Sequence, residues 1–415
     1  MKPIGTLLPQ DWLSAPATRN VMHALKSGTG DAKFVGGCVR DTLLAKPVHD
    51  VDIATTDPPE TVIQLLTQAK IKSIPLGLAH GSVLAVQGDM FFHITTLRTD
   101  LETDGRRAKV GFTQNWHEDA RRRDFTMNAL YADLDGTFYD PCQGLADLKA
   151  GHVIFIGDPV ARIREDYLRI LRFFRFHSFY GQGSPDLKAL EACRSERAGL
   201  QGLSGERIWN ELNRLLMAEN PVPCLNLIWS QDIWNTLFEN VLLPHHALEN
   251  LERLIQLEKK LLLSSHPLRR FALLIEWENI PYLTQRLRWS QHEKNYLQLL
   301  LKILKTNPDF NISKQRNRVL YENGVTIFQD LSLLLAAKRQ EAFEITQSHV
   351  TQAQSWSSVS LPVKGQDLLE LGVPPGPKVG EMLNGLEDWW INNNFKPKRE
   401  ECLVHIKDFY LNKIL

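Results

Sequence analysis

Short hydrophobic runs alternate with turn signals along the first 157 residues of the chain. Runs such as 33–37 (KFVGG), 51–55 (VDIAT), 82–87 (SVLAVQ) and 152–157 (HVIFIG) are typical of β-strands bounded by turns. One clear helix is expected among them at 58–70 (PPETVIQLLTQAK), since its first turn tolerates proline. Because many strands follow one another without a helical crossover, the pattern predicts an α/β domain with a mixed or antiparallel sheet.

Helical periodicity begins near residue 160 and continues to the end of the chain. Apolar residues recur three to four positions apart at Ile163, Tyr167, Ile170 and Phe174, which is the spacing of an amphipathic helix. Polar or proline-rich breaks occur at 309–317 and 357–377. We therefore expect an α/β head at 1–158, followed by three helical regions at 159–225, 226–345 and 346–415.

Composition restricts the class of protein. The chain has 415 residues, with 48 Lys and Arg balanced by 48 Asp and Glu, so any contact with nucleic acid requires local charged patches. A reducing cytoplasm is expected, because the cysteines are odd in number and contain no CxxC pair: Cys38, Cys142, Cys193, Cys224 and Cys402. Neither a signal peptide nor an apolar run of about 18 residues is evident, so we expect no membrane segment.

Two carboxylates carry the first chemical signal. Asp50 and Asp52 are separated by one residue in HDVDIAT, and on a strand this spacing puts both on one face, where they repel unless a cation is present. Mg²⁺ is commonly held by one or two carboxylates together with substrate phosphates. The pair therefore favours a magnesium site for a nucleoside triphosphate, although two surface acids at a strand end would have the same spacing.

The residues before this pair suggest where phosphates bind. The run FVGG ends an apolar strand and residues 38–44 are expected to be helical, which places Gly36 and Gly37 where backbone N–H groups can meet a phosphate. Arg40 and Asp41 follow on that helix. A tight turn and a surface ion pair would account for the same residues.

Together, GGCVRDTLL (36–44) and DVDIAT (50–55) resemble the first motif of the class II tRNA nucleotidyltransferases, the CCA-adding enzymes, whose head is shared with bacterial poly(A) polymerases. The resemblance implies template-independent addition of CCA to tRNA from CTP and ATP, with release of pyrophosphate. It also implies that Asp50 and Asp52 hold one or two catalytic Mg²⁺ ions. In this interpretation Gly36, Gly37 and Arg40 cradle the triphosphate, and Asp41 is a brace.

An arginine cluster lies in the segment EDARRRDFTMNA (118–129). Guanidinium groups pair bidentately with phosphate oxygens, although solvated charges at a helix start would look similar. The segment resembles the second motif of the same family. The resemblance implies that Arg123 and Asp124 contact the ribose and phosphates of the incoming nucleotide, and it adds Asn128 to this nucleotide-binding set.

The run FIGDPVARIREDYLRILRFFRFHSF (155–179) continues the match. On one helix, its charged residues would share a face opposite the apolar ones. Asp166 and Arg169 would then be neighbours, either as an ordinary ion pair or facing a base, since cytosine and adenine both present an amine beside an acceptor. The resemblance implies that the EDxxR motif selects C and A in place of a template: Glu165, Asp166 and Arg169.

Neighbouring residues complete the candidate set. Arg172 is assigned to nucleotide binding and Arg175 is left open. The segment GLSGERIWNEL (202–212) resembles the following motif, in which Arg207 and Glu211 are expected to be structural braces. No His-Asp doublet occurs in the helical half, so a second, hydrolytic activity is not expected.

Several features bear on the choice of activity. The run GLAHGSVLAV (77–86) differs from the arginine-rich run typical of poly(A) polymerases. A polar segment that CC-adding enzymes would lack is present, and it would hinge as the site changes from CTP to ATP; its candidate residues are Asp100, Glu102, Asp104 and Arg106. We therefore expect addition of the full CCA, with poly(A) polymerase, partial CC or A addition, and an inactive RNA-binding relative as alternatives.

One position departs from the family. His93 stands where the family usually has an acid, and a histidine on a strand is more often packed and hydrogen-bonded than catalytic. The segment KGQDLLELGVPPGPKVGEML (364–383) resembles the family's helical tail. This implies contact with the tRNA elbow by the tail, while the acceptor stem meets the head. The oligomeric state, monomer or homodimer, stays open.

Overall fold

The computed structural model describes residues 1–102 and 109–408. The chain divides into two compact units, Met1–Asn240 and a second that begins at Val241. Among the described residues, no helix has the length and apolar character needed to cross a bilayer. The division predicted at residues 158, 225 and 345 stays a prediction.

The first unit is built on an eight-stranded sheet with the order β1-β10-β9-β2-β3-β6-β5-β4. Strands β3 and β6 run parallel, whereas β2 is antiparallel to both β3 and β9, so the prediction of a mixed sheet is confirmed. The strands are β1 (Pro3–Thr6), β2 (Ala32–Val35), β3 (Val51–Thr55), β4 (Lys72–Gly77), β5 (Ser82–Gln87), β6 (Met90–Thr96), β9 (Tyr131–Ala132) and β10 (Thr137–Tyr139). A separate ribbon contains β7 (Arg98–Glu102) and β8 (Lys109–Phe112).

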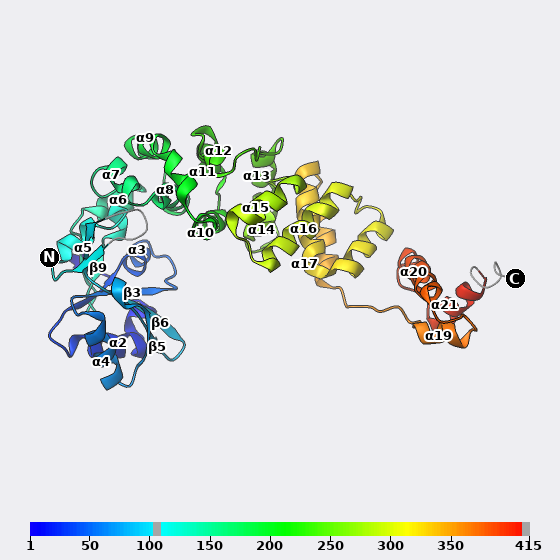
Figure 1. Ribbon diagram of the computed structural model, residues 1–415, viewed down its shortest axis with the longest axis horizontal. Coiled ribbons are helices and arrows are strands. Elements are labelled where there is room, and N and C mark those ends of the chain that lie inside the picture. The colour runs from blue at the N-terminus through cyan, green and yellow to red at the C-terminus, as the bar shows by residue number, and fades with distance from the viewer. Residues whose placement is uncertain (103–108, 409–415) are drawn as a thin grey trace. The chain divides into compact units, whose positions relative to one another are not determined.

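Helices cover one side of the half of the sheet that contains β5. Figure 1 shows α2 (Pro16–Lys26) and α4 (Pro59–Gln68) beside each other there, and both contact β5. Along β6 the residues alternate, since Phe92 and Ile94 are fully buried while Phe91 is 57% exposed. This period of two is the pattern of a strand with one face packed and the other open.

The sequence underestimated the helices of this unit. The helix expected at 38–44 is confirmed as α3 (Gly37–Leu43), but beyond it and α4 the region also contains α1 (Asp11–Ser14), α2, α5 (Trp116–Arg121) and α6 (Gly144–Ala150). The strand expected at 152–157 is wrong, because Phe155 forms only an isolated bridge to Phe125. Instead, Phe155 packs its ring on Phe125 and Phe173. The run is therefore apolar because its side chains are buried, and not because it belongs to a sheet.

The single helix expected after residue 158 is also wrong. The chain forms α7 (Pro159–Glu165) and α8 (Leu168–Tyr180), and Asp166 between them is extended, with φ −158° and ψ 104°. The Asp166 carboxylate accepts the backbone N–H of Leu168 at 3.2 Å. Aspartate side chains compete with the backbone hydrogen bonds of a helix through such local bonds. Because of the break, the Asp166 side chain does not lie where a continuous helix would place it. The unit continues with α9 (Leu187–Ser195), α10 (Gly205–Leu216), α11 (Val222–Ser230) and α12 (Ile233–Leu237).

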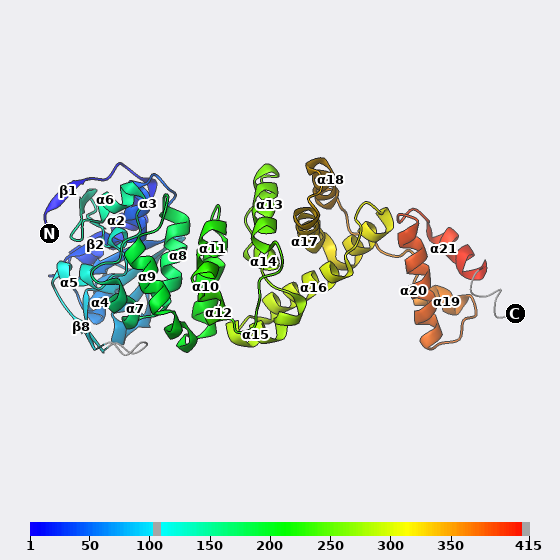
Figure 2. The ribbon, with the colours of Figure 1, turned by 90° about the horizontal axis from the view of Figure 1, so that it is seen from above.

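The second unit is helical, which confirms the predicted class of the C-terminal region. It contains α13 (Ala247–Lys260), α14 (Pro267–Phe271), α15 (Ile280–Leu287), α16 (Gln291–Thr306), α17 (Ser313–Arg339), α18 (Phe343–Gln354), α19 (Gly365–Glu370), α20 (Pro377–Asn392) and α21 (Arg399–Ile406). Figures 1 and 2 both show α16 and α17 side by side, and the two helices are in contact.

Helix α17 is interrupted at Gly324, where φ is 78° and ψ is 176°. Residues with a Cβ rarely adopt this conformation, whereas glycine does so readily. Before the interruption, the Tyr321 hydroxyl donates to Glu387 of α20 at 2.7 Å. After it, Phe328 stacks on Phe310 and lies edge-on to His349 of α18. The two halves of α17 therefore belong to different hydrophobic clusters.

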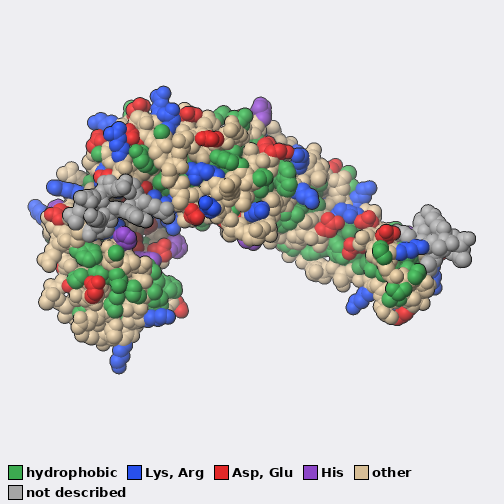
Figure 3. All heavy atoms as spheres, in the orientation of Figure 1, with side chains coloured by type: hydrophobic (Ala, Val, Ile, Leu, Met, Phe, Trp, Pro, Cys, Tyr) green, Lys and Arg blue, Asp and Glu red, His purple; other side chains and the backbone are tan. Residues whose placement is uncertain are grey.

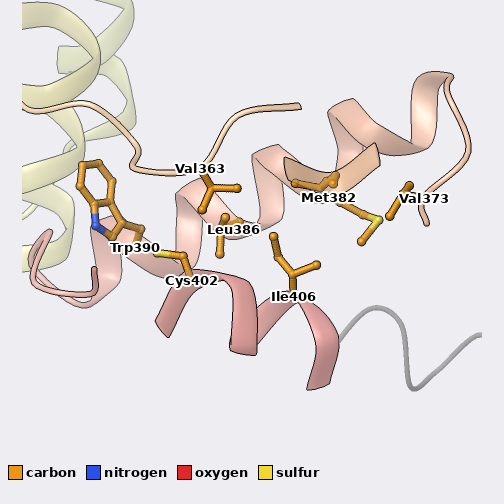
Figure 4. Close-up of a cluster of buried hydrophobic side chains, with 8 residues drawn as sticks. Val363, Val373, Met382, Leu386, Trp390, Cys402 and Ile406 are labelled. Atoms are coloured by element: carbon orange, nitrogen blue, oxygen red, sulfur yellow. The ribbon is translucent and has the colours of Figure 1, made fainter. Parts of the chain in front are cut away.

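The C-terminal helices have a small core of their own. Figure 4 shows side chains from the segment before α19 and from α20 and α21 converging on one another. The buried members are Val363, Leu368, Val373, Met382, Leu386, Trp390, Cys402 and Ile406. Isolated helices of such length are marginally stable in water. Burial of these side chains supplies the stability that this group of short helices needs.

A buried ionic network joins α13, α14 and α17. Glu258 accepts two bonds from Arg269, at 2.6 and 2.9 Å, and two from Arg270, also at 2.6 and 2.9 Å. Arg269 also donates to Asp330 at 2.6 Å. These four side chains are at most 4% exposed, so each charge depends on its partners for the solvation that water no longer supplies.

Replacing Glu258 by Ala is expected to lower the free energy of unfolding by about 3–5 kcal/mol, because it leaves two buried guanidinium groups without their shared carboxylate. Urea unfolding followed by circular dichroism measures the change. The matched control is Glu278→Ala, which removes an exposed pair with Lys305 and should shift the midpoint much less. Equal shifts for both variants would contradict the role given to the network.

Candidate active site

The glycine pair lies between β2 and α3, next to two other predicted residues. Gly36 has φ +71°, and a Cβ built on it would meet the Asn128 carbonyl at 3.6 Å and the Arg123 guanidinium at 3.8 Å. The positive φ favours glycine here, while the two neighbours lie at ordinary van der Waals distance. The structure brings Gly36, Gly37, Arg123 and Asn128 together at one end of β2, although they come from two separate motifs.

Arg40 is held on several sides. Its Nε and Nη2 donate to the Asp41 carboxylate, both at 2.9 Å, and its Nη1 donates to Asn128 Oδ1 at 2.7 Å. Nη2 also donates to the Tyr180 hydroxyl at 2.6 Å. The bidentate geometry with Asp41 agrees with a bracing carboxylate, and it fixes the plane of the guanidinium.

Two aromatic residues of α8 support this arginine, and sequence reasoning missed both. The guanidinium carbon of Arg40 lies 4.1 Å from the ring centre of Tyr180 and 5.3 Å from that of Phe176. Arg172 and Arg175 also approach Phe176, at 5.4 and 4.4 Å. Such distances allow cation–π attraction. The available signal was the four-residue spacing of Phe176 and Tyr180 behind Arg172, which puts all three on one helix face.

Replacing Tyr180 by Phe is expected to raise the KM for the expected substrates, CTP and ATP, at least about tenfold, because it removes one bond to a charged group, worth roughly 1.5–3 kcal/mol. The ring would still cover Arg40, so Tyr180→Ala should raise KM further, with kcat changed less in both. Burial raises the pKa of Tyr180 to about 12, so the effect should not vary between pH 7 and 9. Tyr282→Phe, on an exposed side chain of α15, is the control. A Tyr180→Phe enzyme with unchanged KM would contradict the bracing role.

The carboxylate pair lies at the start of β3. Asp50 is exposed and directly precedes the strand, and Asp52 is partly buried within it. Burial raises the pKa of Asp52, and the charge of Asp50 acts in the same direction, while His93, Arg123 and Arg40 oppose it. Two carboxylates that disfavour each other's charge form a region where a cation would be stabilised.

His93 lies opposite Asp52 in the parallel pairing of β3 and β6. Its side chain is exposed, so the expectation that it is packed is wrong. The reason is the strand period, because Phe92 and Ile94 take the buried face and turn His93 to the open one. His93, which stands where the family usually has an acid, therefore lies beside Asp52 on the open face of the sheet.

Arg123 is anchored by a buried acid. Its Nη2 donates to Asp119 at 3.0 Å and its Nε to the Tyr131 hydroxyl at 3.2 Å, while Tyr131 donates to Asp119 at 2.8 Å. Although burial disfavours its ionisation, Arg123 and Arg122 hold the pKa of Asp119 well below its usual range. Part of the arginine cluster thus neutralises an internal carboxylate, which orients Arg123.

Asp124 joins the second motif to α8. Its carboxylate accepts the backbone N–H of Phe125 and the Asn128 amide, both at 2.9 Å, and Nε of Arg172 at 2.7 Å. Burial opposes ionisation, yet Arg172 and Asn128 hold the pKa of Asp124 well below its usual range. Because Asn128 also binds Arg40, an unbroken chain of bonds runs from α3 to α8.

The base-selecting candidates lie in and beside the break between α7 and α8. Asp166 accepts from Arg207 of α10 at 2.7 Å, whereas Arg169 donates to Glu165 at 2.6 Å and to the carbonyl of Arg162 at 2.7 Å. The expected placement of Asp166 and Arg169 on one helix face is therefore wrong, although the Arg169 backbone N–H donates to the Asp166 carbonyl at 3.0 Å. Since Asp166 is extended, each of the two is oriented by a different partner.

One further contact connects these helices to the head, and another joins α8 to α10. Arg162 donates to the carbonyl of Arg123 at 2.8 Å, and Arg175 donates to Glu211 of α10 at 2.5 Å. Glu211 is also 3.6 Å from Arg172. Arg207 and Glu211 thus lie where a brace would lie, behind Asp166 and behind the arginines of α8.

Comparison with known proteins decides the family. Residues 32–154 match the poly A polymerase head domain, 185–243 the RNA and SrmB-binding site of polymerase A, and 270–405 tRNA nucleotidyltransferase domain 2. Over 384 residues the chain is 35% identical to CCA tRNA nucleotidyltransferase 1, mitochondrial, of Danio rerio, covering 90% of this chain and 86% of the relative. The chain belongs to the CCA-adding tRNA nucleotidyltransferases.

Other members of the CCA-adding family agree. The chain is 30% identical to the CCA-adding enzyme of Streptococcus pneumoniae, strain G54, over 94% of this chain and 96% of the relative. The crystal structure of the Bacillus stearothermophilus CCA-adding enzyme in complex with CTP has a TM-score of 0.80 and 25% identity, covering 98% of this chain and 99% of that one. The Thermotoga maritima enzyme complexed with tRNA has a TM-score of 0.67 at 18% identity, covering 99% and 100%, and supports the fold alone.

The segment expected to move in a CCA-adding enzyme is described in part. Asp100 and Glu102 lie in β7, whose backbone pairs with β8. Asp104 and Arg106 lie outside the described residues. The hinge role of these four residues therefore stays a prediction.

Proposed function

We propose that this chain adds CCA to the 3′ end of tRNA, using CTP and ATP and releasing pyrophosphate. The observation that carries the proposal is the connected site: Arg162 and Arg172 tie the base-selecting helices to the segment that holds Arg123 and Asp124. That segment lies beside Gly36 and contributes, with Arg40, to the charge around Asp52. The named activities of the relatives support the same conclusion.

Mg²⁺ is the proposed cofactor, with Asp50 and Asp52 as its protein ligands. The residues fit this ion, because both are oxygen donors and the pKa of Asp52 is raised by burial and by Asp50. Among the described residues no group of three or more metal-binding side chains occurs, which suits an ion that completes its shell with water and substrate phosphates. When bound, it would neutralise phosphate charge and lower the pKa of the attacking hydroxyl.

The chain's own residues would orient the reactants. Arg40 and Arg123, each fixed by an internal carboxylate, would hold the triphosphate so that the tRNA 3′-hydroxyl attacks the α-phosphate in line. Asp166 would accept from the amine of cytosine or adenine, and Arg169 would donate to the adjacent ring atom. Their bonds to Arg207 and Glu165 would keep these two groups at a set spacing.

Related activities are distinguished by their products. A poly(A) polymerase would extend varied RNAs with long A tails, and a partial enzyme would stop after CC or add only A. An inactive RNA-binding relative would add no nucleotide. The observation that favours this alternative is the histidine at position 93. The bonds that join the motif residues Arg40, Asn128, Asp124 and Arg172 favour an active CCA-adding enzyme.

The proposed partner is tRNA, with the acceptor stem at the head and the elbow at the helical tail, 346–415. Lys and Arg contacts to phosphates would position the RNA, and its shape would supply discrimination. A cytoplasmic location is proposed from the composition. The relative in Danio rerio is named as mitochondrial, so the compartment requires its own test by imaging of the tagged chain.

The decisive experiment uses purified full-length protein, Mg²⁺, CTP, ATP and a tRNA transcript without its CCA end. We expect terminal CCA in the sequenced product and no further growth. Long A tails, a product ending at CC, or an unextended transcript would each overturn the proposal in favour of the corresponding alternative. A transcript without the tRNA fold, supplied in parallel, should be a poor substrate.

A further inference from the structure

A row of side chains leads from the candidate metal site to the edge of the sheet. In the register, Asp52 of β3 lies opposite His93 of β6, His93 opposite Leu84 of β5, and Leu84 opposite Ile74 of β4. Directly opposed residues of neighbouring strands share one face of a sheet. Beside this row, Phe91 lies opposite Val86. The carboxylate and these apolar side chains are therefore on the same face.

This face is open where the opposite face is packed. Phe91 is 57% exposed and Ile74 is 38% exposed, whereas Val83, Ala85 and Phe92, which alternate with the row, are at most 1% exposed. Figure 3 shows hydrophobic side chains on the surface where Figure 1 labels β5 and β6. An exposed aromatic and aliphatic surface that continues into a polar site is typical of a binding surface.

Charge separates the two sides of Asp52. In the strand order, β2 and β9 lie on one side of β3, and β6, β5 and β4 on the other. Arg40 and Gly36 follow β2, and Arg123 is bonded to Tyr131 of β9. The cationic side suits a triphosphate. The apolar side suits the faces of nucleobases, which stack on aromatic side chains irrespective of sequence.

We propose that Phe91, with Leu84, Val86 and Ile74, forms a stacking platform for the unpaired 3′-terminal bases of the acceptor RNA. The inference rests on the proposed function, because the 3′-hydroxyl must reach Asp52 from a side that the triphosphate does not occupy. The open row supplies that side and ends at the carboxylate. Sequence-independent stacking also suits an RNA end that changes by one nucleotide with each addition.

The test uses full-length protein and a tRNA transcript that ends before CCA and carries 2-aminopurine as its last base. Stacking on Phe91 should quench the probe. We expect Phe91→Ala to reduce the quenching and to raise the KM for tRNA about tenfold, with the KM for CTP unchanged. Phe91→Tyr, which keeps a ring, should restore both. Trp229→Ala is the matched control, since Trp229 is 49% exposed at the end of α11.

Several results would overturn the platform. The first such result is a Phe91→Ala variant that still quenches the 2-aminopurine probe fully and has an unchanged KM for tRNA. Another is a Phe91→Ala enzyme that loses a dimer in sedimentation, which would assign this face to a contact between copies. A lowered unfolding temperature in Phe91→Ala, absent in Phe91→Tyr, would mark a structural role. If the unaltered protein adds no nucleotide but still quenches the probe, the proposed function fails and the platform stands.

Discussion

Replacing Asp52 by Asn is expected to lower nucleotide addition by at least about a thousandfold while the protein stays folded and binds tRNA. The substitution keeps the shape of the side chain and removes the charge that a divalent ion requires. A loss of this size corresponds to roughly 4 kcal/mol of transition-state stabilisation. Single-turnover incorporation of CMP, measured with labelled CTP, reports the rate, and filter binding reports the affinity for tRNA.

The same variant should show the opposite trend in stability. The pKa of Asp52 in the folded chain is raised, first by burial, so above its unfolded-state value the ionised carboxylate disfavours folding. Without Mg²⁺, Asp52→Asn is therefore expected to unfold at the same temperature as the unaltered protein or higher. Asp11→Asn, on an exposed side chain at the start of α1, controls for the change of residue type. Full activity in Asp52→Asn would remove the basis for the metal assignment.

Replacing Asp166 by Ala is expected to reduce the preference for CTP and ATP over UTP by about 10- to 100-fold, because the variant lacks the acceptor for the exocyclic amine. The affinity for the triphosphate group should change much less, since Arg40 and Arg123 would still hold it. Single-nucleotide incorporation with each of the four triphosphates measures the preference. An unchanged ratio of CTP to UTP incorporation would show that the base is selected elsewhere.

Arg207 supplies a matched comparison for this result. Its bond to Asp166 has a donor–acceptor distance of 2.7 Å, so Arg207→Ala should relax the orientation of the carboxylate without removing it. We expect the preference to fall in the same direction but by less. A change in Arg207→Ala that exceeds that of Asp166→Ala would mean that the arginine itself contacts the base.

Local sequence patterns were sufficient for the parts of the molecule that depend on local rules. The turns around β2 and β3, the proline at the start of α4 and the spacing of Asp50 and Asp52 follow from period and turn chemistry. The resemblance of the motifs to a known family supplied the candidate residues of α8. The assignment of roles to those residues stays a prediction, although the structure brings most of them together.

What sequence reasoning missed depends on contacts between distant parts of the chain. The periodicity of 159–180 predicts one helix, and the bond from Leu168 to the Asp166 carboxylate, which breaks it, leaves the apolar pattern intact. Tyr180 meets Arg40 across 140 positions, and Glu258 has its partners in another helix. An arginine or tyrosine in a single sequence carries no sign of which distant group it will face.

The interruption at Gly324 has a practical consequence for anyone who shortens this chain. The linker between α18 and α19 is the obvious place to cut, since Gln354 ends one helix and Gly365 begins the next. A protein cut there would lose α20 and with it the partners of Tyr321, which contacts Trp390 and Glu387 from the early half of α17. That half-helix precedes the cut, so the shortened protein would keep a segment whose apolar surface belongs to the removed part.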